Sequence, residues 1–134
     1  YIEKNDLSET VIWLGRFPLD MMPAFCSRAD VLFLALKDDF IFSLTAPAKL
    51  QSYMAVGKPI VAMIDGETQN IISEAQCGIC VNAGDYKAFA DSILSMSEDS
   101  ALERLGYSGY EYFKANFSKK ICFDRLEELI SNES

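Results

Sequence analysis

Residues 47–64 read PAKLQSYMAVGKPIVAMI, and this stretch decides the fold. Apolar residues recur at helical spacing over residues 47–56, which predicts a helix with one core-facing side. The Gly-Lys-Pro sequence at residues 57–59 is typical of the end of a helix. Residues 60–64 are an unbroken apolar run, as expected for a buried strand of a parallel sheet. The stretch therefore predicts a helix that leads into a central strand.

Predicted strands and helices also alternate on both sides of this stretch. The predicted strands are residues 11–14, 31–36, 60–64 and 79–81, and the predicted helices are residues 20–29, 47–56, 67–75 and 85–96. Two more helices are predicted in a C-terminal tail, at residues 101–115 and 118–131. Since alternating strands and helices are the signature of βαβ units, we expect an α/β fold of one domain over residues 1–134. It should contain a Rossmann-like parallel sheet flanked by helices.

Composition narrows the range of partners. The 134 residues are half hydrophobic and carry a net charge of −8, so the chain can bury one core and should repel nucleic acid. The longest apolar run, residues 31–36, is far below the roughly 20 residues that span a bilayer. Four cysteines and no histidine favour a reduced compartment. We expect a soluble, cytoplasmic domain with no nucleic acid partner.

Cys77 and Cys80 have CxxC spacing, but their surroundings do not favour a metal or redox site. A zinc site would need a second close pair or histidines, whereas Cys26 and Cys122 stand alone. A thioredoxin-like motif would open a helix, whereas residues 79–81 predict a strand. We therefore expect both thiols to pack in the core, and no metal to bind.

Polar side chains follow the first three predicted strands. Gly15, Arg16 and Phe17 follow the first strand. Residues 37–40 (Lys-Asp-Asp-Phe) follow the second strand, and residues 65–67 (Asp-Gly-Glu) follow the third. Because ligands bind beyond the carboxyl ends of the strands in open parallel sheets, these segments are predicted to line a site at one edge. The alternative is that they are ordinary polar loops.

The predicted helix that begins near Pro47 has a second side that suits a ligand. Pro47 fits the first turn, with Thr45 or Ala46 as its cap. Thr45, Lys49 and Ser52 fall on one flank, away from the apolar side. The first amides of a helix carry a partial positive charge, so together with Lys49 they would stabilise a diphosphate. A solvated lysine without a ligand is the alternative.

Taken in order, these segments resemble the retaining GT-B glycosyltransferases of family 4, in particular bacterial enzymes of surface-polysaccharide assembly. The resemblance covers nearly the whole chain. It rests on residues 11–16 (VIWLGR), 29–34 (ADVLFL), 47–61 (PAKLQSYMAVGKPIV), 65–67 (DGE), 77–78 (CG) and 84–85 (GD). It implies that the chain is part of the C-terminal, donor-binding half of a two-domain enzyme, without the N-terminal acceptor domain.

The resemblance also implies a donor site for a nucleotide sugar, often a UDP-sugar. Gly15, Arg16 and Phe17 would lie against the base, and residues 45–49 would approach the diphosphate and the sugar. Helix amides and basic side chains, rather than a metal ion or another cofactor, would stabilise the leaving diphosphate. Ser52 and Glu67 complete the expected site, and no catalytic residue is assigned.

The sequence departs from the family pattern in two ways. Many members have two glutamates spaced eight apart around this helix, and the later one holds the ribose; the matching positions here are Leu44 and Ser52. A serine holds a ribose hydroxyl less strongly than a carboxylate does. In addition, the chain resembles a donor domain truncated before its third strand. We therefore expect weak nucleotide-sugar binding by this chain and no activity on its own.

These features predict the donor-binding part of a retaining, metal-independent glycosyltransferase of bacterial capsule, O-antigen or exopolysaccharide synthesis. The full-length parent would work in the cytoplasm at the inner face of the membrane. A non-catalytic module that partners a separate acceptor-domain subunit is one alternative. A receiver-like domain is another, although Gly15 and Arg16 stand where such a domain needs acidic residues. Apolar surface on the helical tail would favour homodimers.

Overall fold

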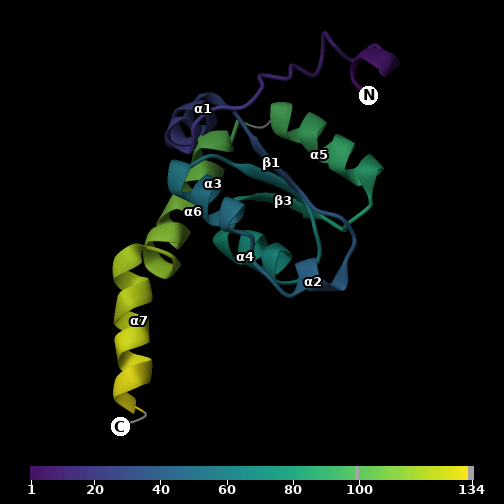
Figure 1. Ribbon diagram of the computed structural model, residues 1–134. Helices are drawn as coiled ribbons and strands as arrows, with labels where there is room; N and C mark the ends of the chain where they lie inside the picture. The colour runs from purple at the N-terminus through teal and green to yellow at the C-terminus, as the bar shows by residue number, and fades with distance from the viewer. Residues whose placement is uncertain (99, 133–134) are drawn as a thin grey trace.

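A parallel three-stranded sheet forms the centre of the computed structural model, which describes residues 1–98 and 100–132. The strands lie in the order β1 (Leu32–Ala35), β2 (Ile60–Met63) and β3 (Gly78–Val81) (Figure 1). Ile60 of the central strand pairs with Leu32 on one side and with Gly78 on the other. The predicted α/β fold with a parallel sheet flanked by helices is confirmed.

The predicted helices are all present, and the tail is helical as expected. The helices are α1 (Met22–Arg28), α2 (Phe40–Ser43), α3 (Ala48–Val56), α4 (Glu67–Ala75), α5 (Tyr86–Ser97), α6 (Leu102–Asn116) and α7 (Lys119–Asn132), with 3-10 turns η1 (Glu3–Asn5) and η2 (Leu19–Met21). Helix α2 and turn η1 were not predicted. Asp85 caps α5 as the sequence suggested, because its carboxylate accepts a hydrogen bond from the Ala88 amide at 2.9 Å.

The main core lies on one face of the sheet, between the strands and helices α3, α4 and α6. Leu34, Ile60 and Ala62 of the strands meet Leu50 and Met54 of α3, and all five side chains are buried. Helix α5 contacts β2 and β3 on the other face (Figure 1). Two covered faces explain why every residue of β2 is buried.

Strand β1 departs from the expectation of a strand buried on both faces. Its side chains alternate between buried and exposed, and Phe33 remains 48% exposed. Phe33 makes an edge contact with Phe89 of α5, at 5.9 Å between ring centroids, and still leaves about half of its surface exposed. The physical reason is that β1 is an edge strand and α5 packs over its neighbours β2 and β3.

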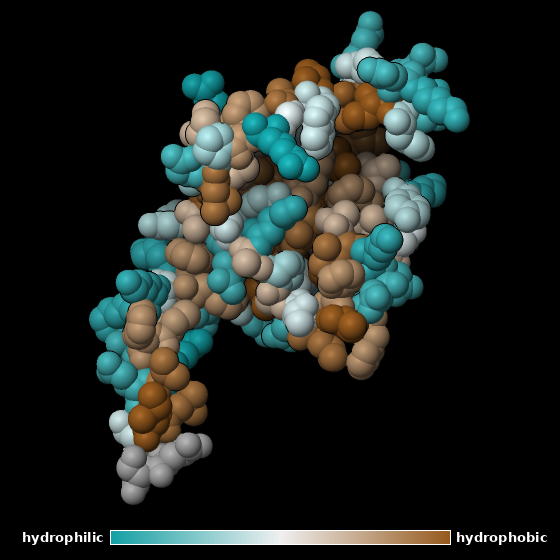
Figure 2. All heavy atoms as spheres, viewed as in Figure 1, coloured by the Kyte–Doolittle hydropathy of each residue, from teal (hydrophilic) through white to brown (hydrophobic). Residues whose placement is uncertain are grey.

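Helix α7 extends away from the rest of the molecule, next to α6 (Figure 1). Figure 2 shows hydrophobic atoms gathered on its outer part. They agree with an exposed apolar stripe of Phe123, Leu126, Leu129 and Ile130, whose exposed fractions range from 51% to 67%. The aromatic side chains of α6 behave differently, since Tyr112 and Phe113 pack against the core. In the part of the chain that the structure describes, no helix has the length and hydropathy to cross a membrane.

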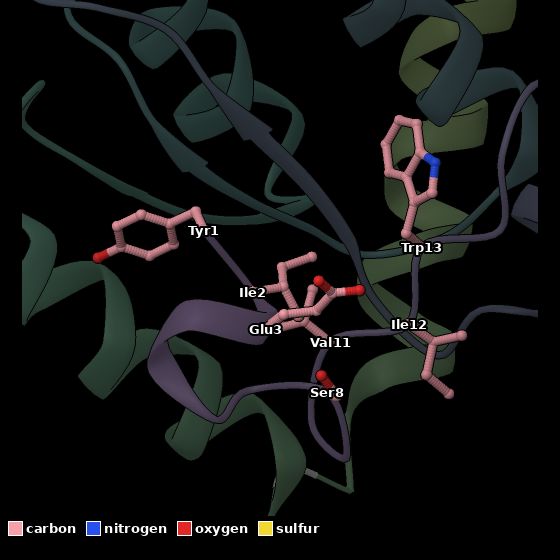
Figure 3. A pocket seen from close by; sticks show the side chains of 7 residues that line it. All are labelled: Tyr1, Ile2, Glu3, Ser8, Val11, Ile12 and Trp13. Atoms are coloured by element: carbon pink, nitrogen blue, oxygen red, sulfur yellow. The ribbon is translucent and has the colours of Figure 1, made fainter.

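The predicted strand at residues 11–14 does not form. The Val11 amide donates a hydrogen bond to the Leu7 carbonyl at 2.8 Å, so the run leaves a turn rather than pairing with β1. Ile12 and Trp13 are 74% and 78% exposed, and their side chains point in opposite directions (Figure 3). An apolar run becomes a strand only where a neighbouring strand accepts and donates its hydrogen bonds. Residues 11–14 have no such neighbour among the described residues.

Candidate functional site

Three loops meet at the carboxyl edge of the sheet, and they enclose a pocket of about 310 Å³. The first loop follows β1 and includes α2, the second follows β2, and the third follows β3. The lining residues are Lys37, Asp38, Asp39, Phe40, Phe42, Ser43, Ile64, Asp65 and Ala83. The structure therefore brings together two of the three segments that the sequence predicted to meet, the loops after β1 and β2. The loop after β3, which contributes Ala83, was not among the predicted segments.

Two of the pocket's carboxylates hold the loops in place. Asp65 accepts a hydrogen bond from the Ala83 amide at 3.2 Å and so ties the end of β2 to the end of β3. Asp39 accepts from the Ile41 amide at 3.0 Å and caps α2. The pocket contains one cation, Lys37, against the three acids at positions 38, 39 and 65. This balance suits hydroxyl groups, which can donate to carboxylates, better than it suits phosphate.

The start of α3 provides the features that an anion needs. Thr45 and Lys49 are both exposed, and Lys49 is the second residue of the helix. The amides of Ala48 and Lys49 lie in the first turn, where a helix has no internal acceptor for them. Pro47 itself is the N-cap residue, and no side chain caps the helix. The expectation that Thr45 or Ala46 caps it is therefore wrong, which leaves this end of the helix open.

Ser52 lies three residues beyond Lys49 on α3, and the two exposed side chains share a side of the helix. The Ser52 hydroxyl donates a hydrogen bond to the Ala48 carbonyl at 3.1 Å. Its oxygen can still accept a hydrogen bond, but its proton is already engaged with the helix backbone. The predicted flank of Thr45, Lys49 and Ser52 is exposed as expected.

The loop between α2 and α3 is attached to the first turn of α4. The Thr68 hydroxyl donates a hydrogen bond to the Thr45 carbonyl at 3.2 Å. At Gly66, the N-cap residue of α4, a Cβ atom would lie 1.9 Å from the Ser43 carbonyl oxygen. The start of α4 is therefore in direct contact with the end of α2 and with the loop that leads into α3.

Glu67 is the first residue of α4 and is exposed. Its carboxylate accepts a long hydrogen bond of 3.5 Å from the Asn70 side chain, within the same helix turn. A negative side chain at this position favours the helix itself, because it lies at the positive end of the helix dipole. Its neighbour Thr68 contacts the loop before α3, and the role of Glu67 in a donor site stays a prediction.

Gly15, Arg16 and Phe17 are not part of this pocket. Phe17 packs instead on Phe25 of α1, with 4.6 Å between ring centroids. The expectation that this segment follows a strand and shares an edge with the other loops is wrong for this structure, because residues 11–14 are not paired in the sheet. A separate pocket of about 480 Å³ lies further toward the N-terminus (Figure 3). Its lining contains Glu3 and no lysine or arginine, so its side chains do not favour phosphate.

Sequence reasoning missed several residues of the site region, which are Phe42, Ser43, Ile64, Thr68 and Ala83. Ala83 follows β3, which is the last of the four predicted strands. Because ligands bind beyond the carboxyl ends of parallel strands, the segment after this strand could also have been predicted to line the site. Thr68 gave no local signal, because its partner Thr45 is 23 residues away. A threonine in the first turn of a helix more often marks a cap than a tertiary contact.

The two cysteines with CxxC spacing pack in or near the core. Cys77 is fully buried, and Cys80 is half-buried in β3, where its thiol donates to the Ile64 carbonyl at 3.3 Å. Burial raises the pKa of each thiol to about 11. The expectation of buried packing is confirmed for Cys77. Across the described residues, no three His, Cys, Asp or Glu side chains form a metal-binding group.

Comparison with known proteins decides the family. Residues 1–99 match the family described as glycosyl transferases group 1. The chain belongs to this family. No significant sequence match was found among curated proteins.

The fold is also shared with a solved structure. Sucrose-phosphate synthase from Thermosynechococcus elongatus superposes with a TM-score of 0.74 at 21% sequence identity. The match covers 99% of this chain but only 33% of that protein, so this member of the glycosyl transferases group 1 family spans about a third of its structural relative. At this identity the likeness shows the fold alone.

Proposed function

We propose that this chain binds the donor nucleotide sugar of a glycosyltransferase. The observation that carries the proposal is the open start of α3, which presents free amides, Lys49 and Thr45 beside a pocket at the carboxyl edge of the sheet. Membership of the glycosyl transferases group 1 family supports the same reaction class. Since the chain spans a third of its structural relative, transfer itself belongs to a longer protein in this proposal.

The two parts of the site would hold different parts of the donor. The diphosphate would lie at the start of α3, where first-turn amides and the Lys49 ammonium group stabilise negative charge. The sugar would occupy the pocket of about 310 Å³, where Asp38 and Lys37 can bond its hydroxyl groups. Ser52 and Glu67, both exposed, would contact the ribose or the sugar in this proposal. The base would be held by Gly15, Arg16 and Phe17 only if that segment moves toward the edge.

The finer parts of the proposal rest on the sequence resemblance. They are a UDP-sugar as donor, retaining transfer without a metal ion or other cofactor, and a bacterial capsule, O-antigen or exopolysaccharide as product. The acceptor would bind a separate N-terminal domain, and the parent would work in the cytoplasm at the membrane surface. The exposed stripe on α7 supports a partner on that side, either the acceptor domain or a second copy of the chain.

The proposal predicts weak but localised binding of UDP to this chain. In a nuclear magnetic resonance titration with UDP into the millimolar range, amide shifts should cluster at residues 45–52. Lys49→Gln should weaken the apparent affinity about tenfold, because it removes a charged hydrogen-bond donor. Lys87→Gln is the matched control, since Lys87 is an exposed lysine on α5 with an ion pair of its own to Asp91.

Two results would contradict the proposal. Shifts scattered over the surface, or an equal effect of Lys49→Gln and Lys87→Gln, would mean that UDP has no site at α3. Submicromolar affinity would contradict the expectation that the binding site is incomplete in this chain. Replacing UDP by ADP, GDP and their glucose conjugates in the same titration would identify the base and the contribution of the sugar.

A further inference from the structure

We infer that Thr68 is a positioning residue for the donor site: it holds the loop between α2 and α3 so that Thr45 and Lys49 stay at the open helix start. The inference rests on the proposed donor function. It assigns to Thr68 no contact with the donor, because its side chain is fully buried. Its effect passes through the backbone of Thr45.

The contact itself is specific. The Thr68 hydroxyl donates to the Thr45 carbonyl at 3.2 Å, and it joins the first turn of α4 to a loop residue 23 positions earlier in the sequence. No buried side-chain nitrogen or oxygen lacks a partner among the described residues, so this hydroxyl has its proper acceptor. Because a buried hydroxyl without a partner is costly, the contact should persist whenever the domain is folded.

A second contact holds the end of α2, two residues before Thr45. Gly66 has a φ of +78°, and its α-carbon lies so close to the Ser43 carbonyl that a Cβ would be 1.9 Å from the oxygen. The start of α4 therefore touches residue 43 at the end of α2 and residue 45 in the loop. These contacts fix the path of the backbone immediately before Pro47, where α3 begins.

Ala46 packs against the core, but few other hydrogen bonds hold this loop. The other hydrogen bonds of Leu44 and Thr45 in the described structure return to α2, at Ile41 and Phe42, and those made by Thr45 are 3.5 Å long. Without the Thr68 hydroxyl, Thr45 would keep only these local contacts to a four-residue helix. A binding group on a loosened loop must be ordered when the ligand arrives, which lowers affinity.

The experiment compares three variants of the full chain. Thr68→Val removes the hydroxyl and keeps the shape, whereas Thr68→Ser keeps the hydroxyl. Ser108→Ala is the matched control, because the Ser108 hydroxyl donates to the Ala75 carbonyl at 2.6 Å at the opposite end of α4. Amide hydrogen exchange of residues 43–49 is measured without ligand, and UDP affinity is measured by amide shifts in the same samples.

The expected result is a local effect of Thr68→Val. Exchange at residues 43–49 should become roughly tenfold faster and the apparent UDP affinity should fall about three- to tenfold, which corresponds to the loss of one hydrogen bond. Thr68→Ser should restore most of both values. Ser108→Ala should lower the melting temperature without changing either value at these residues.

The experiment distinguishes failure of the positioning role of Thr68 from failure of the proposed donor site. Unchanged exchange and unchanged UDP affinity in Thr68→Val overturn the positioning role and leave the donor site standing. Equal losses in Thr68→Val and Ser108→Ala overturn it too, because they reflect general destabilisation. If UDP causes no shifts at residues 45–52 of the unmodified chain, the donor site is refuted and the positioning role with it.

Discussion

Gly66 shows how one residue allows the start of α4 to approach the end of α2 closely. Its backbone has φ of +78° and ψ of −139°, a conformation that residues other than glycine rarely adopt. Because glycine has no Cβ, there is also room for the Ser43 carbonyl. A Cβ atom at this position would lie 1.9 Å from the carbonyl oxygen. Both the conformation and the close approach therefore require glycine at this position.

Gly66→Ala should lower the free energy of unfolding by about 3 kcal/mol, because the new methyl group adds a backbone clash to an unfavourable φ. Gly84→Ala is the control, since Gly84 has a similar φ of +82° but open space around the position of its Cβ. That variant should lose only about 1 kcal/mol. Urea denaturation measures both values, and equal losses would show that the contact with Ser43 is loose.

The thiols of Cys77 and Cys80 should be slow to react with iodoacetamide in the folded protein. The thiolate is the reactive form, and burial raises the pKa of both thiols from 9.0 to about 11. At pH 8 this alone slows alkylation about 100-fold relative to an ordinary thiol. Cys122 is exposed and serves as the internal control in a mass-spectrometric time course.

The same shift links these thiols to stability. Since the folded state favours the neutral thiol, the two thiols contribute to the free energy of unfolding fully below about pH 9. This contribution is lost as the pH rises through about 11.

The alkylation experiment can also contradict core packing. Rapid modification of Cys77 or Cys80 at pH 8, at a rate close to that of Cys122, would do so and would reopen a redox role for the pair.

At the scale of elements, α7 differs from the rest of the molecule because its apolar stripe is uncovered. Phe123, Leu126, Leu129 and Ile130 are all more than half exposed, and they recur at helical spacing. Neighbouring α6 contacts α3 and α4 and contributes aromatic side chains to the core. The stripe is therefore surface that a further domain or a second copy could bury.

Self-association through α7 is expected to be weak and dependent on concentration, because one helix face is smaller than a standard interface. In sedimentation experiments the apparent mass should rise with concentration, and Leu129→Ser should reduce this rise. Leu94→Ser is the matched control, because Leu94 on α5 is 66% exposed and Leu129 is 67% exposed. A monomer at all concentrations, or an equal effect of both variants, would contradict association through the stripe.

At the scale of the whole molecule, the candidate site is built from parts that are far apart in sequence. Its pocket combines loops after three strands, and its helix start is held by α4. The segment expected to contact the base, Gly15, Arg16 and Phe17, lies outside the pocket and packs on α1 through Phe17. The chain therefore holds the phosphate and sugar parts of the proposed site in place, but not the base part.

Much of the fold followed from the sequence alone, because helix and strand signals are local. The apolar run at residues 60–64, the helical spacing of residues 67–75 and the acidic cap at Asp85 each depend on neighbours within a few residues. The exposed flank of α3 also followed, since Lys49 and Ser52 are placed by the same periodicity that buries Leu50 and Met54.

Only the tertiary structure decided which segments find a partner. Residues 11–14 have the composition of a strand but no neighbouring strand in the described structure, and Phe33 stays exposed because α5 covers β2 and β3 rather than β1. The contact from Thr68 to Thr45 and the fit of Gly66 against Ser43 are equally invisible in the sequence. Periodicity reports which side of an element is apolar, whereas hydrogen-bond partners and free space depend on residues distant in the chain.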